Sequence, residues 1–494
     1  MDATERKLPG SIDYSDVLPL SVPASSSRRK FFPVNGGSFN AAGSNEIRIP
    51  ISSTNALLDC EHSYLDFTVT NNNAAVTMNL DSGGAAMFFS RVRVEQQGQV
   101  LSDTQEYNRL VASVLNPVSE TGGGRLASTI KDMTMAGNTA AAVPNLVPEL
   151  VAVRNGGRLG LTNHGAGLTF AAAGASQRFS MPLITGLFTQ DKLVPLPLVD
   201  KTNPITIVLT LDIVNNYGVY SAAPLADSMP ITRISYNAQL VEVGPDVISQ
   251  FAMMRDMLGG QLALSGHDWE HNSAPLAGGA GGGGGERIVP IPIRKRSIKS
   301  LFWVANSDSM ANTGLASISL IYNKSYGGTC NMNSYQLKVG SLTYPQTPIQ
   351  GPGASAAAPS QYRRGECLSE LCKAIGTLSF AAPSGRTINT LTYCGDAGSA
   401  VGATTADGDN GVGGAALASI GDTPVFCAAF GLDLEAFQHT AIESGVDSET
   451  MALQTNLIID VDATIGAEDK TIHSWICYDK HYYFNTDGSV TKSE

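Results

Sequence analysis

Residues 286–307, ERIVPIPIRKRSIKSLFWVANS, repeat a pattern that first occurs at residues 46–71, EIRIPISSTNALLDCEHSYLDFTVTN. In both segments an Ile-rich strand that contains proline is followed by a second strand-like run. Two further pairs of segments match in the same order: 88–105 with 333–351, and 181–243 with 425–484. The offset between partners stays between about 235 and 255 residues. This matching order favours a tandem duplication of one structural unit.

Apolar and polar residues alternate in the candidate strands. Between Ile205 and Ile213 the odd positions are aliphatic, whereas Thr206, Thr210 and Asp212 occupy even positions. This period of two predicts half-buried strands in antiparallel sheets with one solvated face. Strands follow strands with turn-rich loops between them, which argues against a βαβ protein. Three short stretches have helical character: 103–115, 245–259 and 432–439.

The length of each repeat indicates which kind of β-sandwich it forms. The chain has 494 residues and a mass of 51.7 kDa, so each copy has about 200 residues, enough for eight strands with long loops. We therefore expect a mainly β protein with two tandem eight-stranded jelly-roll β-sandwiches, a double jelly roll, with short helices in loops. The expected segments are an N-terminal arm (1–43), the first jelly roll (44–246), an interdomain helix and Gly-rich linker (247–286), the second jelly roll (287–484) and a C-terminal tail (485–494).

Composition excludes several classes of protein. Charged residues are 15% of the chain and the formal net charge is −12, which argues against a surface that binds nucleic acid throughout. Seven scattered cysteines form no CxxC pair, as in a reduced intracellular chain. The first residues lack an apolar signal region, and no run of about 18 apolar residues predicts a transmembrane helix.

The densest group of possible metal ligands is HDWEH, residues 267–271. A zinc site of the HExxH type needs its two histidines and its Glu on one helical face, and here the acids lie at other positions. Gly266 and the following NSAP predict a loop, which Trp269 would anchor. An interdomain loop is therefore preferred to a metal site.

Three other pairs of reactive residues have plainer explanations. Cys367 and Cys372 would need a histidine that nothing in the sequence selects. Asp460 and Asp462 share one strand face, as in a glycosidase, but their alternation with apolar residues favours a solvent-facing or intersubunit surface. Asp407 and Asp409, in TTADGDNGVGG, lack the terminal Glu of a calcium loop, which favours a surface turn. We expect no catalytic, cofactor-binding or metal-binding residue.

Two basic groups remain as candidate contact sites. Arg28, Arg29 and Lys30, in the expected arm, are candidates for a surface that faces a genome or an internal membrane; the alternative is a solvated tail. A second group, at 294–299, precedes the aromatic pair 302–303 and is compatible with nucleic-acid stacking. It is equally compatible with charges that protect a strand edge.

The segments YQLKVGSLTYPQTPIQG (335–351) and FGLDLEAFQHTAIESGVDSE (430–449), together with the paired sandwiches, resemble double jelly-roll major capsid proteins of icosahedral DNA viruses. Polinton-like viruses and virophages look nearest, and the resemblance spans roughly residues 44–484. It implies a homotrimer with six jelly rolls in a pseudo-hexagonal ring, tiled into a capsid. Loops 351–360 and 395–416 would then be top-side or intersubunit loops.

The resemblance implies a shell subunit rather than an enzyme, and it carries over no cofactor. Partners would be neighbouring capsomers, penton and minor capsid proteins, with weak genome or membrane contact through the arm. The chain would be made inside the host cell and located in the virion. One alternative is a glycan or glycopeptide hydrolase on a paired β-sandwich, which needs an aromatic cleft, although the chain has only three tryptophans. Another is a secreted adhesin or lectin array.

Overall fold

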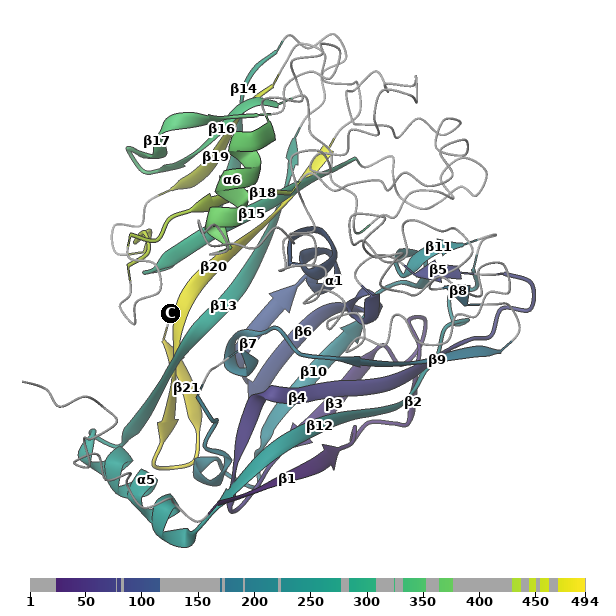
Figure 1. Ribbon diagram of the computed structural model, residues 1–494, viewed down its shortest axis with the longest axis vertical. Helices are drawn as coiled ribbons and strands as arrows, with labels where there is room; N and C mark the ends of the chain where they lie inside the picture. Colours follow the sequence, from purple (N-terminus) through teal and green to yellow (C-terminus); the bar gives the residue numbers. More distant parts are fainter. Residues whose placement is uncertain are drawn as a thin grey trace, which may run out of the picture.

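The computed structural model describes residues 24–76, 78–80, 84–115, 169–170, 174–189, 192–220, 224–276, 284–307, 324, 332–351, 364–375, 429–436, 444–449, 454–461 and 470–493. These residues form two β-lobes that follow one another along the long axis of the molecule (Figure 1). Two long strands near the junction, labelled β13 and β20, extend from the second lobe alongside the first.

The first lobe is a sandwich of two antiparallel sheets. One sheet has the order β1 (Ala24–Phe31), β12 (Ile231–Val243), β4 (Ala56–Asn71) and β9 (Ala175–Met181), and the short β2 (Ser38–Phe39) also pairs with β12. The other has the order β3 (Glu46–Ile51), β10 (Ile205–Leu211), β6 (Phe89–Gln96) and β7 (Gln99–Gln105). Two four-stranded sheets connected in this way make a jelly roll.

The second lobe repeats this arrangement strand for strand. Its first sheet has the order β13 (Gln261–Leu276), β20 (Lys470–Asn485), β15 (Ile298–Ser307) and β18 (Ala429–Asp433), with β21 (Val490–Ser493) also paired to β20. Its second has the order β14 (Gly285–Ile291), β19 (Thr455–Val461), β16 (Met332–Val339) and β17 (Leu342–Gln350). The prediction of two tandem eight-stranded jelly rolls is confirmed.

The duplication extends to the aromatic cores. Phe67 of β4 stacks on Phe179 of β9, with ring centroids 5.5 Å apart. At the corresponding place in the second lobe, Trp303 of β15 stacks on Phe430 of β18 at 4.3 Å. All four side chains are fully buried, as the alternation of the strands predicts. Ile213 departs from the predicted alternation and is 59% exposed, because β10 ends at Leu211.

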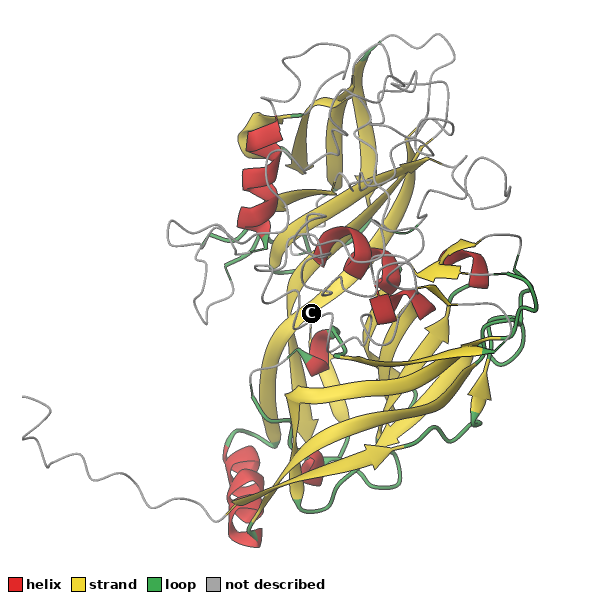
Figure 2. Cartoon of the chain, turned by 45° about the vertical axis from the view of Figure 1, so that its right-hand side comes forward, coloured by secondary structure: helices red, strands yellow, loops and turns green. Residues whose placement is uncertain are grey.

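Short elements connect the strands. They include a small sheet of β11 (Gly218–Tyr220), β5 (Met78–Leu80) and β8 (Thr169–Phe170), and the helical segments η1 (Gly84–Phe88), α1 (Tyr107–Arg109), η2 (Leu110–Leu115), η3 (Gly186–Phe188), η4 (Leu196–Leu198), η5 (Val214–Asn216), α5 (Pro245–Met257) and α6 (Arg364–Ala374). Figure 2 shows α5 at the lower end of the molecule and α6 beside the second lobe.

The three helix predictions have different outcomes. The helix expected over 245–259 is present as α5. The one expected over 103–115 begins only at Tyr107, because the preceding residues complete β7. The helix expected over 432–439 is wrong at its start, since Leu432 and Asp433 end β18. Helix α6 was not predicted, although Cys367 and Leu371, four residues apart, mark its buried face.

Three of the expected segments contain strands and need new boundaries. Strand β1 lies within the arm expected over 1–43, and β13 lies within the linker expected over 247–286. Strand β1 shows no apolar alternation because only its last residue, Phe31, is buried, so backbone pairing with β12 defines it. Gly266 suggested a loop in β13, but every residue of that strand is paired with β20. The tail expected over 485–494 contains β21.

Candidate assembly surfaces and the junction between the lobes

The junction between the two lobes is built by strands of the second jelly roll that continue past their own core. Leu264 of β13, Tyr482 and Phe484 of β20 and Val490 of β21 are all buried in the hydrophobic core of the first lobe. Strands β13 and β20 pair over their whole length and form a long ribbon (Figure 1). This ribbon joins the two sandwiches into one unit.

A buried ion pair lies at the centre of the junction. Asp268 of β13 and Lys480 of β20 approach to 2.8 Å, and their side chains are 1% and 2% exposed. The other carboxylate oxygen of Asp268 accepts hydrogen bonds from the Ser102 hydroxyl at 2.7 Å and the Gly186 backbone N–H at 3.2 Å. The first lobe therefore supplies the polar groups that a buried charge requires.

A second set of contacts holds the C-terminal hairpin against the first lobe. The Gln96 amide donates hydrogen bonds to the carbonyls of Gly488 at 2.9 Å and Asn203 at 3.1 Å, and its oxygen accepts one from the Val490 N–H at 2.6 Å. Higher in the junction, the Trp475 indole N–H donates to the Gln105 carbonyl at 3.3 Å. These bonds fix the position of β20 and β21 relative to β6 and β7.

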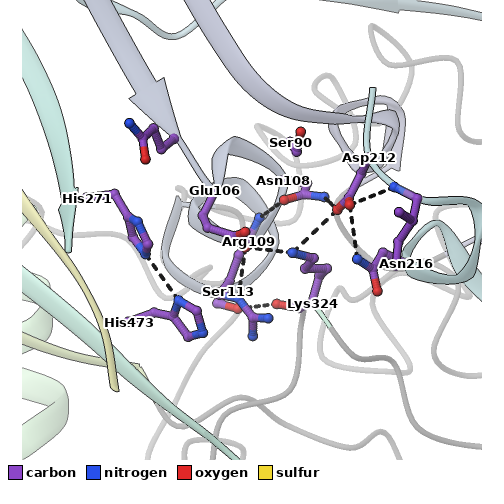
Figure 3. A network of polar contacts seen from close by, with 12 residues as sticks. Ser90, Glu106, Asn108, Arg109, Ser113, Asp212, Asn216, His271, Lys324 and His473 are labelled. Atoms are coloured by element: carbon purple, nitrogen blue, oxygen red, sulfur yellow. Dashed lines mark hydrogen bonds and ion pairs between the residues drawn. The ribbon is translucent and has the colours of Figure 1, made fainter. Parts of the chain in front are cut away.

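A charged network fills the space beside α1 (Figure 3). The Lys324 ammonium lies 2.6 Å from Glu106 and 3.4 Å from Asp212, and Arg109 lies 3.4 Å from Glu106. Asn108 donates a hydrogen bond to the same Asp212 oxygen, Oδ2, at 2.6 Å. Burial by itself would raise the pKa of Glu106, but the two cations outweigh burial and lower the pKa to about 2. Glu106 therefore remains ionised inside the protein.

Two stacked histidines border this network (Figure 3). His271 Nε2 and His473 Nδ1 are 3.1 Å apart, and the rings stack with centroids 5.3 Å apart. Burial lowers the pKa of His271 to about 4, and burial together with the Arg109 charge lowers that of His473 to about 2. Both imidazoles are neutral near pH 7, so one ring can donate its N–H to the other.

The HDWEH segment belongs to β13 and not to the loop that its sequence suggested. Its ionisable side chains each have a protein partner: His267 with Asp479, Asp268 with Lys480, Glu270 with Lys295, and His271 with His473. Trp269 packs against Phe302 at 5.6 Å. Among the described residues no group of three or more His, Cys, Asp or Glu side chains is placed to hold a metal ion.

The other candidate pairs are dispersed. Cys367 and Cys372 are buried in α6, where the Cys367 thiol donates to the Gln350 carbonyl at 2.9 Å. Asp460 lies in β19 and contacts Asn333 at 3.4 Å. The positions 462, 407 and 409 lie outside the described residues, as do almost all of the loops predicted at 351–360 and 395–416.

The two basic groups differ in their surroundings. Within 294–299, Lys295 pairs with Glu270, and Lys299 pairs with Glu435 at 2.9 Å, so only Arg294 and Arg296 are exposed. In contrast, Arg28, Arg29 and Lys30 all lie exposed on β1, at the edge of its sheet. Arg28 stacks over the Tyr64 ring at 5.4 Å, and Lys30 reaches Asp66 at 3.9 Å.

Helix α5 exposes an apolar surface at the lower end of the molecule (Figure 2). None of its residues is buried. The helix and the residue that follows it expose four large apolar side chains: Met253 (63%), Met254 (50%), Met257 (87%) and Leu258 (61%). A surface of this kind is typical of a contact with another molecule. No helix in the described part of the chain combines the length and the apolar character needed to cross a membrane.

Most residues of the junction were missed from the sequence because their partners are distant in the chain. Ser102 and Asp268, for example, are 166 positions apart. One signal was present: Lys480 has the same strand parity as Tyr482 and Phe484, so alternation places it among inward-facing residues. An inward-facing lysine needs a buried acid, which indicates an ion pair without identifying Asp268.

Two jelly rolls in one chain, joined by a shared ribbon, define a double jelly-roll protein. Comparison with solved structures confirms this fold. VP54 of PBCV-1, fitted into a cryo-EM reconstruction of the virophage Sputnik, is 10% identical and matches 97% of this chain and 99% of its own, with a TM-score of 0.58. A cryo-EM structure of the Sputnik virophage is 10% identical and matches 100% of this chain and 92% of its own, with a TM-score of 0.53.

A quasi-atomic model of the PBCV-1 virus capsid gives a similar result, with 10% identity, 97% and 99% coverage and a TM-score of 0.53. No protein-family model and no curated protein matches the sequence. The similarity therefore lies in the three-dimensional arrangement of the strands and extends over both lobes.

Proposed function

We propose that this chain is the major capsid protein of an icosahedral DNA virus. It assembles as a homotrimer with a pseudo-hexagonal outline, and these capsomers tile into a closed shell around the genome. The observation that carries the proposal is the match of both jelly rolls at once, over 97% of this chain to PBCV-1 capsid structures and over 100% to the Sputnik virophage structure. A single shared sandwich would not favour a shell subunit over other β proteins.

The surface of the molecule supports this function. Assembly into a symmetric shell needs broad side surfaces and does not need a deep reactive cleft. The edge strands β1 and β17 and the apolar surface of α5 supply such surfaces. The low content of charged residues reduces repulsion between neighbouring copies.

The hydrolase alternative has less support. Trp303 and Trp475 are fully buried, and Trp269 packs against Phe302, so the tryptophans do not provide an open platform for a sugar ring. A surface hollow between β1 and β4 contains one carboxylate, Asp59, which lies 2.8 Å from His62. Glycoside hydrolysis usually requires two carboxylates across the substrate.

The proposal extends to partners and location. The chain contacts copies of itself within a capsomer and in neighbouring capsomers, and it contacts penton and minor capsid proteins at other positions of the shell. The exposed cations Arg28, Arg29 and Lys30 are available for weak contact with the genome or an internal membrane. The protein is made in the host cell and is located in the virion.

The decisive experiment is to express the full chain and to determine its mass in solution by light scattering, with negative-stain imaging of the same fractions. We expect the mass of three chains and particles with a hexagonal outline, or closed shells. A monodisperse monomer at micromolar concentration that hydrolyses glycans would overturn the proposal.

A further inference from the structure

The strands β7 and β17 occupy the same place in their jelly rolls but differ in how they are covered. In β7, Ser102 and Thr104 are 0% exposed. In β17, Leu342 is 58% exposed and all residues from Pro345 to Pro348 are exposed. The fold of the two lobes is the same, so the difference arises from what lies against each strand.

The β13–β20 ribbon covers β7. Leu264 and Asp268 of β13 share one face of their strand and are 6% and 1% exposed, because this face lies on the first lobe. The Ser102 hydroxyl of β7 donates its hydrogen bond directly to Asp268. Backbone pairing does not join β7 to β13, so side chains make this contact.

The first lobe has an equivalent ribbon, formed by β1 and β12. On β1 the residues that share the face of the buried Phe31 are Ser25, Ser27 and Arg29. Ser25 and Arg29 are exposed, in contrast to Leu264 and Asp268 on β13. In the described part of the chain, the β1–β12 ribbon therefore covers no strand of the other lobe. Conversely, no ribbon among the described strands covers β17.

We infer that the β1–β12 ribbon of one copy packs against β17 of a second copy, as the β13–β20 ribbon packs against β7 within the chain. The inference rests on the proposed assembly into trimers and specifies which surfaces meet there. The contact is heterologous, since different surfaces of the two copies are used, and such contacts close into a ring when the rotation allows it. In a ring of three chains, junctions within and between chains would alternate.

Charge and backbone chemistry support this pairing of surfaces. Arg29 gives the Phe31 face of the ribbon a positive charge in a chain with a net charge of −12. Beside β17 lies α6, whose exposed Glu366 accepts a hydrogen bond from the Gln350 N–H at 3.2 Å. The prolines of β17 lack an N–H and prevent continuous strand addition, so the contact is made through side chains, as at β7.

The inference is tested by placing a photo-reactive benzoylphenylalanine at Gln346, an exposed position of β17, in the full-length chain. Trimers are assembled from a mixture of nitrogen-15-labelled and unlabelled chains, so that mass spectrometry of mixed-isotope peptides identifies links between copies. We expect Gln346 to link to residues 24–31 or 236–243 of another copy. The same probe at Thr206, on the outer face of β10, is expected not to yield these peptides.

Charge reversal gives a second readout. Arg29→Glu should weaken trimer association at least about tenfold, measured by light scattering across a dilution series. The matched control Arg294→Glu, on an exposed arginine of the second lobe, should leave association unchanged. Circular dichroism checks that both variants are folded. Trimers whose Gln346 links map elsewhere would overturn the inference and leave the proposed function intact, whereas a chain that never forms trimers would overturn both.

Discussion

The strands β1 and β13 are the first strands of their jelly rolls and hold the same place in the sheet order, yet they have opposite environments. Strand β13 has 16 residues, and one face of its first half lies against the other lobe, where Leu264 and Asp268 are buried. Strand β1 has eight residues, and only Phe31 is buried. A duplicated fold thus produces two equivalent ribbons, and among the described residues only the second of them packs against a surface of the other lobe. The buried ribbon can carry an ion pair, whereas the exposed ribbon carries solvated cations.

The largest effect of this difference is expected at Asp268. The Asp268→Ala variant leaves the Lys480 ammonium buried without its carboxylate, and the hydroxyl of Ser102 loses its acceptor. We expect the free energy of unfolding to fall by about 3–5 kcal/mol. Urea denaturation followed by tryptophan fluorescence measures this change at fixed protein concentration, because oligomer formation also affects apparent stability.

A paired substitution serves as the control. The Asp268→Asn/Lys480→Met variant removes both charges and keeps an oxygen that accepts from Ser102 and Gly186, so it should recover most of the lost stability. If Asp268→Ala lowered the free energy of unfolding by less than about 1 kcal/mol, the result would contradict the desolvation of the ion pair that its burial indicates.

The second largest effect is expected from acid at the histidine pair. In the unfolded chain a histidine binds a proton near pH 6.5, whereas in the fold the pKa of His271 is about 4 and that of His473 about 2. The unfolded state therefore binds more protons below pH 6.5, and stability falls as the pH falls. His271 alone should lower the free energy of unfolding by about 3 kcal/mol between pH 6.5 and pH 4.

Glu106 acts in the same direction but at lower pH. Its pKa of about 2 in the fold means that its stabilising contribution is lost below its ordinary value near 4.5. The His271→Gln/His473→Asn variant should therefore flatten the stability profile between pH 6.5 and 4 and keep the decline below that range. If the free energy of unfolding of the variant fell with pH as steeply as that of the parent between pH 6.5 and 4, these imidazoles would not control the pH dependence of stability.

A smaller effect is expected where β21 meets β6. Gln96→Ala removes the acceptor of the buried Val490 N–H and the donor to Gly488, at a cost of about 2 kcal/mol. The matched control in the other lobe is Gln336→Ala on β16, whose amide donates to exposed carbonyls of β17 and should change stability by less than about 0.5 kcal/mol. Equal losses in the two variants would contradict the buried role of Gln96.

Residues that face a core could be predicted from the sequence, and residues that face another lobe could not. Ile207 and Leu209 alternate with polar neighbours, so their burial in β10 follows from strand geometry alone. The tandem duplication also followed from the repeated segments. Strand β1 escaped prediction because an edge strand with neither face fully covered has no apolar alternation. Its cations were recognised, but they were assigned to an arm.

The residues of the junction could not be predicted from the sequence for a related reason. Asp268 lies in a segment whose charges suggested a metal site or a loop, and its partners Ser102 and Lys480 come from distant parts of the chain. Local periodicity marks Lys480 as inward-facing but does not identify its distant partner. Only the combination of β-pairing and lobe packing shows that HDWEH is part of a strand in which Asp268 is buried and each ionisable side chain has a protein partner.

The smallest effect is expected on the exposed ribbon, at Lys30. Its ammonium lies 3.9 Å from Asp66, and its side chain is 43% exposed. Arg178 also binds Asp66, with its Nε 2.7 Å from one carboxylate oxygen, so Lys30 is the weaker partner. Lys30→Ala should change the free energy of unfolding by less than about 0.5 kcal/mol, because solvent screens an exposed pair. Urea denaturation of the dissociated chain measures this change in the free energy of unfolding. A decrease of more than about 1 kcal/mol would mean that β1 is covered by other residues, in the way that β13 is covered by the first lobe.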